Sequence, residues 1–446
     1  MASESAGQDP SQDDPQPSPP PHQPNGSPSI TSTNPTISPE KEANILQACK
    51  WKNIDGLRSL AISDGGFFSD ALRQLAWPIL LGCGKSNQET EDAGDHEKNL
   101  PSTPWKDLPR HQDEDQVKLD VDRAFVYYPT PISDARLASE TACLSDLITE
   151  VLRQHPYLSY FQGYHDICQV FQLILPGKVR YEAVSRLSVL RIRDFMLPTL
   201  AGCITQLRLI PELISLADPE LALHLGIGSL SPLKSESPLT FLAALARDRD
   251  DESIADSVHL SAMQGTLTMY AHDIESLARI SRLFDALLAH EPVFSLYLFA
   301  EMVLSRREEL INSAGEDPDI LLWTLQKLPS SHASNLDEVV QQAARLYERV
   351  PPAKLKGWGA ISENSVLKTG THPLRQSEAL GETWFNAQVK ELKQAERRKK
   401  MIVALRKYKK PAGRMFGIAM LVGFIAILFK REAGTGWVVN LLGWKL

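Results

Sequence analysis

The sequence has few cysteines and no spacing of them that suits a metal or a disulfide framework. Its 446 residues contain five cysteines, which lie far apart at Cys49, Cys83, Cys143, Cys168 and Cys203. A zinc knuckle needs paired CxxC ligands, and a disulfide scaffold needs an even set of cysteines. We therefore expect no metal site and a reducing, cytosol-facing environment.

Signatures of nucleotide and nucleic-acid binding are missing as well. The chain has no glycine-rich phosphate loop and no alternation of strands and helices, so it is not expected to bind a nucleotide by itself. The formal charge of -8 argues against a nucleic-acid partner.

Residues 1–38 lack the large apolar side chains that a folded core requires. They hold nine of the thirty prolines, and almost no large apolar residue precedes Ile30. We predict a disordered Pro/Ser-rich arm. It has no apolar segment typical of a cleaved secretory signal. An inert spacer is the preferred interpretation, and binding to proline-reading modules is the alternative.

Apolar residues at three- and four-residue spacing dominate the chain from residue 39 to about residue 350. This period predicts helix after helix, beginning at Pro39, and hence an all-α domain over residues 39–350. A polar, mostly acidic stretch over residues 83–105 predicts a loop. Residues 351–414 are interpreted as a linker that ends in a basic juxtamembrane segment.

The C-terminal part of the chain holds the only long apolar run. Residues 390–414 contain eleven Lys or Arg and two acids, and the uncharged stretch Met415–Phe429 follows. Fifteen helical residues span about 22 Å, short of a hydrocarbon core of about 30 Å, so a buried core helix is the alternative to a membrane span.

We predict a transmembrane tail anchor over residues 415–431, because the run is apolar on all faces and little chain remains to bury it. The basic residues before this run place the large N-terminal region in the cytosol. A short post-membrane segment, residues 432–446, lies along the opposite interface or forms a frayed tail.

Two short motifs combine residue types that carry chemistry. In "QVKLDVDRAFVYYP", residues 116–129, Val117, Asp120 and Arg123 recur every three residues and would share one side of a helix. Such an Asp/Arg pair alone is usually a solvated ion pair. Some forty residues later, "YFQGYHD" places Gln162 directly before Gly163. The two residues after Tyr164, His165 and Asp166, also suit metal-dependent HD hydrolases, but a structural pair is preferred because no further ligands of that pattern can be identified.

Taken in order, these motifs resemble those of the TBC-domain GTPase-activating proteins for Rab GTPases. That family carries Arg-x-x-x-Trp, Ile-x-x-Asp-x-x-Arg and Tyr-x-Gln-Gly. The first motif is present here as Arg73 to Trp77, the second as Val117, Asp120 and Arg123, and the third as Tyr160, Gln162 and Gly163. The resemblance covers roughly residues 45–350. The spellings "WKDLP" and "RDFMLPT" and the terminal apolar run are similar to the membrane-anchored branch typified by TBC domain family member 20.

The resemblance implies an all-α TBC domain of two helical subdomains that acts on a Rab GTPase. Arg123 would be an arginine finger, which stabilises charge on the γ-phosphoryl group, and Gln162 a glutamine finger, which orients the attacking water. Asp120 would hold the Arg123 loop by hydrogen bonding. Tyr160 would pack or hydrogen-bond beneath the site, and Gly163 would let its loop press against the Rab.

Several further expectations follow from the same likeness. The protein would be a GTPase activator with no hydrolase site and no cofactor of its own, acting on the GTP and Mg bound to the partner Rab. Arg73 and Trp77 would brace the N-terminal helices. The location would be the membrane of the endoplasmic reticulum or early Golgi, with a role in traffic between them. The alternative is a non-catalytic, membrane-anchored Rab-binding adaptor with a TBC fold.

Two departures from the family pattern stand out. Val117 replaces the usual isoleucine, a change of one methylene that should cost little. In "GTLTMYAHD", residues 265–273, Met269 and Tyr270 lie where relatives tend to place tryptophans. We expect the C-terminal half of the domain to pack differently around this segment.

Overall fold

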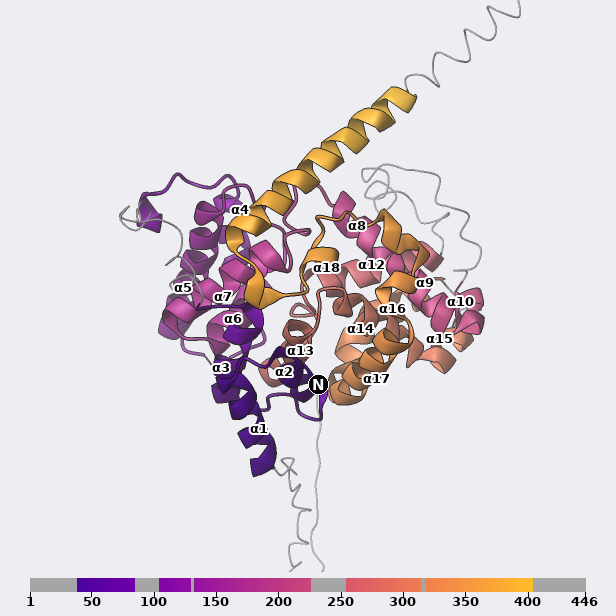
Figure 1. Ribbon diagram of the computed structural model, residues 1–446, viewed down its shortest axis with the longest axis horizontal. Coiled ribbons are helices and arrows are strands. Elements are labelled where there is room, and N and C mark those ends of the chain that lie inside the picture. The colour runs from indigo at the N-terminus through magenta and orange to yellow at the C-terminus, as the bar shows by residue number, and fades with distance from the viewer. Residues whose placement is uncertain (1–37, 85–103, 130–131, 226–253, 314–317, 404–446) are drawn as a thin grey trace, which may run out of the picture. The chain divides into compact units, whose positions relative to one another are not determined.

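Helices make up the regular structure of this protein (Figure 1). The computed structural model describes residues 38–84, 104–129, 132–225, 254–313 and 318–403. Every regular element within these ranges is an α-helix or a short 3-10 helix, and no strand occurs among them. The all-α fold class predicted from the apolar spacing is therefore confirmed.

A first group of helices is built from the chain up to residue 190. Its first helix begins at Pro39, as the sequence predicted. Two later helices begin at side-chain caps, where Asn53 accepts a hydrogen bond from the Gly56 N–H and Ser69 accepts one from the Leu72 N–H. The group consists of α1 (Pro39–Lys50), α2 (Ile54–Ile62), α3 (Asp70–Leu81), α4 (Glu114–Val121), α5 (Asp134–Gln154), α6 (Tyr164–Ile174) and α7 (Gly177–Leu190), with the 3-10 helix η1 (Trp105–Asp107).

The second group follows in the chain and includes the most apolar helices. These elements are α8 (Ala201–Leu207), α9 (Leu209–Ala217), α10 (Pro219–His224), α12 (Ile254–Leu267), α13 (Leu277–Ala289), α14 (Phe294–Leu304), α15 (Arg307–Ser313), α16 (Pro318–Ser331), η4 (His332–Ser334) and α17 (Leu336–Arg349). Helix α14 contacts α9, α12, α16 and α17. Helix α13 packs against α2, α3 and α6 of the first group and α17 of the second, so it joins the two groups.

One buried carboxylate ties α3 to α13. Asp285 is fully buried and accepts hydrogen bonds from Arg73 Nε at 3.1 Å and from Trp77 Nε1 at 2.8 Å. The backbone N–H of Phe67 donates to the same carboxylate at 3.0 Å. Because a buried charge is tolerated only when it is paired and hydrogen-bonded, these contacts fix the two helices in register.

The folded part of the chain continues past residue 350, where the sequence predicted a linker. This part contains η5 (Pro352–Lys354), η6 (Lys356–Ala360), α18 (Val366–Thr369), η7 (Pro373–Arg375) and a long helix over residues 378–403. The buried Asp194 accepts hydrogen bonds from Ser365 Oγ at 2.5 Å and from the Val366 N–H at 3.2 Å, and Phe385 is buried. The linker assignment is therefore wrong for residues 351–385. The apolar residues in the irregular part of this segment, residues 351–377, lack a helical period.

The predicted disordered arm and membrane anchor lie outside the described residues. Within the described ranges, no helix has the length and apolar character needed to cross a bilayer. The described chain ends with the helix over residues 378–403, the yellow helix of Figure 1. From Lys393 to Lys400 its side chains are mostly exposed, and five of these eight residues are Lys or Arg.

Candidate functional site

Arg123 lies in the turn that follows α4. The sequence predicted one helix face for Val117, Asp120 and Arg123, but α4 ends at Val121. The Arg123 N–H then donates to the Asp120 carbonyl at 3.1 Å, which closes a tighter turn. As a result Val117 and Asp120 point into the protein, whereas the Arg123 side chain is 67% exposed.

The buried Asp120 carboxylate orients Arg123. Asp120 Oδ1 accepts from Arg123 Nη2 at 2.6 Å and from Gln116 Nε2 at 3.1 Å, and Asp120 Oδ2 accepts from the Tyr160 hydroxyl at 2.9 Å. Arg123 Nε also donates to the Leu119 carbonyl at 3.2 Å. A guanidinium has five N–H donors, so three remain without a partner among the described residues.

Gln162 lies in the turn that leads into α6. Its neighbours Phe161 and Tyr164 are buried, which anchors the turn, whereas Gln162 itself is exposed and its amide has no partner among the described side chains. Gly163 follows with a φ of 99°, a left-handed conformation that glycine adopts without steric cost.

Gly163 has no room for a side chain within the protein itself. A Cβ atom at this residue would lie 2.6 Å from Thr268 Cγ2 of the same chain. Gly163 is buried. Glycine is required here by the conformation of the turn and by its contact with Thr268.

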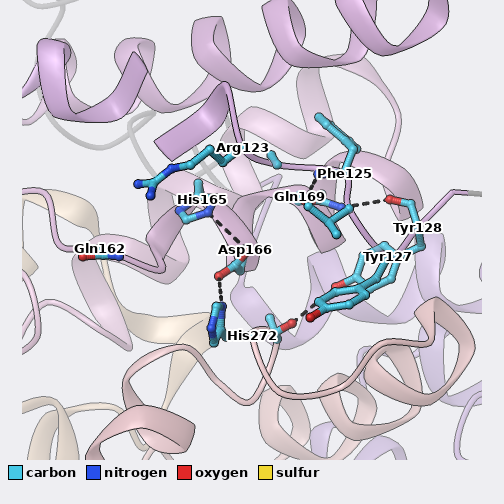
Figure 2. A pocket seen from close by; sticks show the side chains of 12 residues that line it. Arg123, Phe125, Tyr127, Tyr128, Gln162, His165, Asp166, Gln169 and His272 are labelled. Carbon is cyan, nitrogen blue, oxygen red and sulfur yellow. Dashed lines mark hydrogen bonds and ion pairs between the residues drawn. The ribbon is translucent and has the colours of Figure 1, made fainter. Parts of the chain in front are cut away.

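Arg123 and Gln162 line one open cavity of about 200 Å³. Figure 2 shows the Arg123 guanidinium and the Gln162 amide on the same side of the site, with His165 between the two chain segments. The remaining walls come from the loop after Arg123, from α6 and from the segment that contains His272. Two side chains from separate motifs thus line the same cavity.

The loop after Arg123 is held by a residue that sequence reasoning missed. Gln169 of α6 is buried, accepts a hydrogen bond from the Phe125 N–H at 3.2 Å and donates one to the Tyr128 carbonyl at 3.0 Å. Phe125 itself has a φ of 63°. An amide on the apolar face of a helix is the signal that could have identified Gln169, because buried amides need such partners.

Two histidines flank the Asp166 carboxylate at the floor of the cavity. His165 Nε2 lies 3.3 Å from Asp166 Oδ1, and His272 Nδ1 lies 3.1 Å from Asp166 Oδ2. Burial lowers the pKa of His165, whereas the hydrogen bond to Asp166 raises the pKa of His272. The two histidines beside this carboxylate therefore have pKa values shifted in opposite directions.

Similarity to known proteins agrees with this geometry. A profile described as the Rab-GTPase-TBC domain matches residues 70–233, which include all three motifs. The chain is 28% identical over 346 residues to the GTPase-activating protein gyp10 of Schizosaccharomyces pombe, covering 77% of this chain and 82% of that relative. It is 28% identical over 330 residues to TBC1 domain family member 20 of Homo sapiens, covering 73% and 71% of the two chains. The GTPase-activating protein GYP8 of Saccharomyces cerevisiae is 32% identical over 197 residues, 39% of this chain and 37% of that relative.

Residues 70–233 of the chain therefore match the Rab-GTPase-TBC domain. Arg73 and Trp77 lie in the interior, where both donate hydrogen bonds to Asp285, and they do not line the cavity of Arg123 and Gln162. Asp120 and Tyr160 lie directly behind Arg123.

The cavity that Arg123 and Gln162 line offers hydrogen-bond donors and a positive charge to a partner. No group of three metal-ligating side chains suited to an ion occurs in the described part of the chain. A guanidinium binds phosphate oxygens through paired N–H groups, and a carboxamide both donates and accepts hydrogen bonds. Such a pair suits the stabilisation and orientation of groups that another molecule brings to the site.

Proposed function

We propose that this protein accelerates GTP hydrolysis by a Rab GTPase, with Arg123 and Gln162 inserted in trans into the nucleotide site of the GTPase. The observation that carries the proposal is that both side chains are exposed on one cavity while their backbones are anchored by buried neighbours. The names of the relatives support the same activity.

The chemistry required is electrostatic and positional. Phosphoryl transfer spreads negative charge over the γ-phosphoryl oxygens and needs an attacking water in line with the leaving group. The free N–H groups of Arg123 would bind those oxygens, and the Gln162 amide would accept from and donate to the water. The GTP and its Mg ion belong to the Rab, so the TBC domain supplies only side chains.

Single-turnover hydrolysis tests this proposal. The full chain, purified in detergent, is mixed with each member of a panel of GTP-loaded Rabs, including those of the early secretory pathway. We expect at least one Rab to respond, and Arg123→Ala to remove about 10³-fold or more of the acceleration. Arg279→Ala, at an exposed arginine of α13, is the matched control and should leave the rate unchanged.

Two outcomes would overturn the catalytic proposal. The first is that no Rab in the panel responds. The second is that Arg123→Ala binds the responsive Rab normally and retains full activation. A chain that binds a Rab without accelerating hydrolysis would instead support the adaptor alternative.

We further propose that residues 415–431 anchor the protein in a membrane of the endoplasmic reticulum or early Golgi, with the TBC domain in the cytosol. The support is in the sequence, where an uncharged apolar run follows a basic segment. Extraction of membranes with alkaline carbonate tests this. An anchored chain stays in the pellet, and release into the supernatant would contradict the proposal.

A further inference from the structure

The segment that departs from the family pattern, residues 265–273, forms a rigid turn at the edge of the cavity. Met269 and Tyr270 have φ angles of 50° and 64°, a left-handed conformation that is unfavourable for such side chains. The turn is closed by a hydrogen bond from the Tyr270 N–H to the Gly265 carbonyl at 2.7 Å. Tyr270 is fully buried and its hydroxyl donates to the Ser295 carbonyl of α14 at 2.8 Å. This anchor keeps the strained turn in one conformation.

The turn contacts the Gln162 segment at two points. Thr268 Cγ2 fills the space in which a side chain of Gly163 would lie. His272 Nδ1 is 3.1 Å from Asp166 Oδ2 in the first turn of α6. One contact lies at Gly163, directly after Gln162, and the other lies at Asp166. The backbone that carries Gln162 is therefore braced by the turn that follows α12.

A continuous series of polar contacts extends from the second of these points to Arg123. Asp166 lies beside His165 Nε2 at 3.3 Å, and His165 Nδ1 lies 3.3 Å from the Tyr160 hydroxyl. The Tyr160 hydroxyl donates to Asp120, which pairs with Arg123. Figure 2 shows the part of this series that runs through His165, Asp166 and His272. The segments that carry Arg123 and Gln162 are thus connected through partly buried side chains and the buried Asp120.

We propose that His272 is a positioning residue, which fixes Gln162 relative to Arg123 through its hydrogen bond to Asp166. This inference rests on the proposed function and deepens it. His272 is 58% exposed and contributes little to the core, so its contact with Asp166 is the feature that it adds to the domain. Because misplacement of a reacting group by about 1 Å can cost roughly 10²-fold in rate, a loosened Gln162 turn should lower the maximal rate of hydrolysis.

The test compares two substitutions of the same residue. His272→Ala removes the donor to Asp166, whereas the side-chain amide in His272→Asn can still donate from the position of Nδ1. For a responsive Rab, His272→Ala should lower kcat about tenfold or more, with KM little changed. His272→Asn should recover most of that loss. His372→Ala, at another exposed histidine, is the matched control.

Different results would overturn the inference. If both His272 variants raise KM and spare kcat, His272 contacts the GTPase directly. If neither variant alters kcat or KM, the contact with Asp166 has no positioning role. Thr268→Ser, which removes the methyl group against Gly163 and keeps the hydroxyl, should lower kcat in the same direction and tests the other brace independently.

A measurement without a GTPase separates failure of this inference from failure of the proposed function. Amide hydrogen exchange in the peptide that spans Tyr160 to Asp166 should increase in His272→Ala and remain unchanged in His272→Asn. Equal protection in the wild-type chain and His272→Ala would show that His272 does not fix the turn, whether or not any Rab responds. If the wild-type chain activates no Rab while exchange behaves as expected, only the proposed function fails.

Discussion

The Arg123 guanidinium lies 2.6 Å from the Asp120 carboxylate, with the arginine 67% exposed and the aspartate fully buried. Arg123 is available to a partner, whereas Asp120 is held in the interior. Asp120 is in turn fixed by Gln116 and by the Tyr160 hydroxyl. The exposed cation is therefore oriented before any partner binds, which reduces the ordering that binding must bring about.

Asp120→Asn should lower both stability and activation. The substitution removes the charge that Arg123 and Tyr160 contact, at a cost of about 1–3 kcal/mol in the free energy of unfolding. It also frees Arg123, so kcat should fall by about tenfold or more. Urea unfolding and single-turnover hydrolysis measure the two effects.

Asp55, which pairs with Arg58 three residues later but is 92% exposed, is the matched control. Asp55→Asn should change stability by less than about 0.5 kcal/mol, and equal effects at the two sites would contradict the argument.

Asp285→Asn should destabilise the domain strongly. The change leaves Arg73 in the interior without its buried counter-charge and weakens the acceptor for Trp77, at a cost of about 3–5 kcal/mol. Denaturant unfolding measures it. Asp70 pairs with the same arginine, but its own side chain is 55% exposed. Asp70→Asn should therefore cost about 1 kcal/mol or less. Similar losses for both variants would show that burial does not determine the strength of these pairs.

Gly163→Ala should destabilise the protein more than Gly177→Ala, although both glycines have positive φ angles. A Cβ atom at Gly163 meets Thr268 Cγ2 at 2.6 Å, whereas a Cβ atom at Gly177 has open space around it. Gly177→Ala should cost only the backbone term of about 1–2 kcal/mol. Gly163→Ala should cost more and should also reduce activation, because the clash displaces the Gln162 turn. Thermal unfolding of both variants is the measurement, and equal shifts in Tm would argue against the contact with Thr268.

Glu301→Gln should make stability less dependent on pH. Burial raises the pKa of Glu301 to about 7, from an ordinary value of 4.5. Between these values the folded state holds a proton that the unfolded state has lost, so stability falls as pH rises toward 7. Glu301→Gln removes this pH-dependent loss of stability. The variant should therefore be more stable than the wild-type chain at pH 8 by roughly 1–3 kcal/mol. The difference should shrink toward pH 5. Urea unfolding at several pH values tests this, with the exposed Glu348→Gln as control, and a difference that is constant with pH would contradict it.

The sequence was most informative where a local pattern determines the structure. The three- and four-residue apolar spacing predicted helices, and proline at a first helical position located the start of α1 at Pro39. The spacing of Asp120 and Arg123 predicted that they would pair, although the helix ends between them at Val121.

Contacts between distant segments could not be predicted from such patterns. Nothing in the sequence near Gly163 indicates that Thr268 fills the space beside it. The buried role of Asp194 as acceptor for Ser365 and Val366 likewise depends on packing between remote segments. Irregular segments such as residues 351–377 have no period to read, so their apolar residues are identified as core only in the folded chain.

The most direct test of the central claim uses a responsive Rab in two forms, the natural GTPase and a variant whose own catalytic glutamine is replaced by leucine. Single-turnover GTP hydrolysis is measured for each form with the wild-type chain, Arg123→Ala, Gln162→Ala and the exposed control Gln154→Ala. If Arg123 and Gln162 complete the nucleotide site of the GTPase, the wild-type chain and Gln154→Ala will accelerate hydrolysis by both forms of the Rab, and neither Arg123→Ala nor Gln162→Ala will accelerate either form. Full acceleration by Gln162→Ala, or none by the wild-type chain on the leucine variant, would contradict the account.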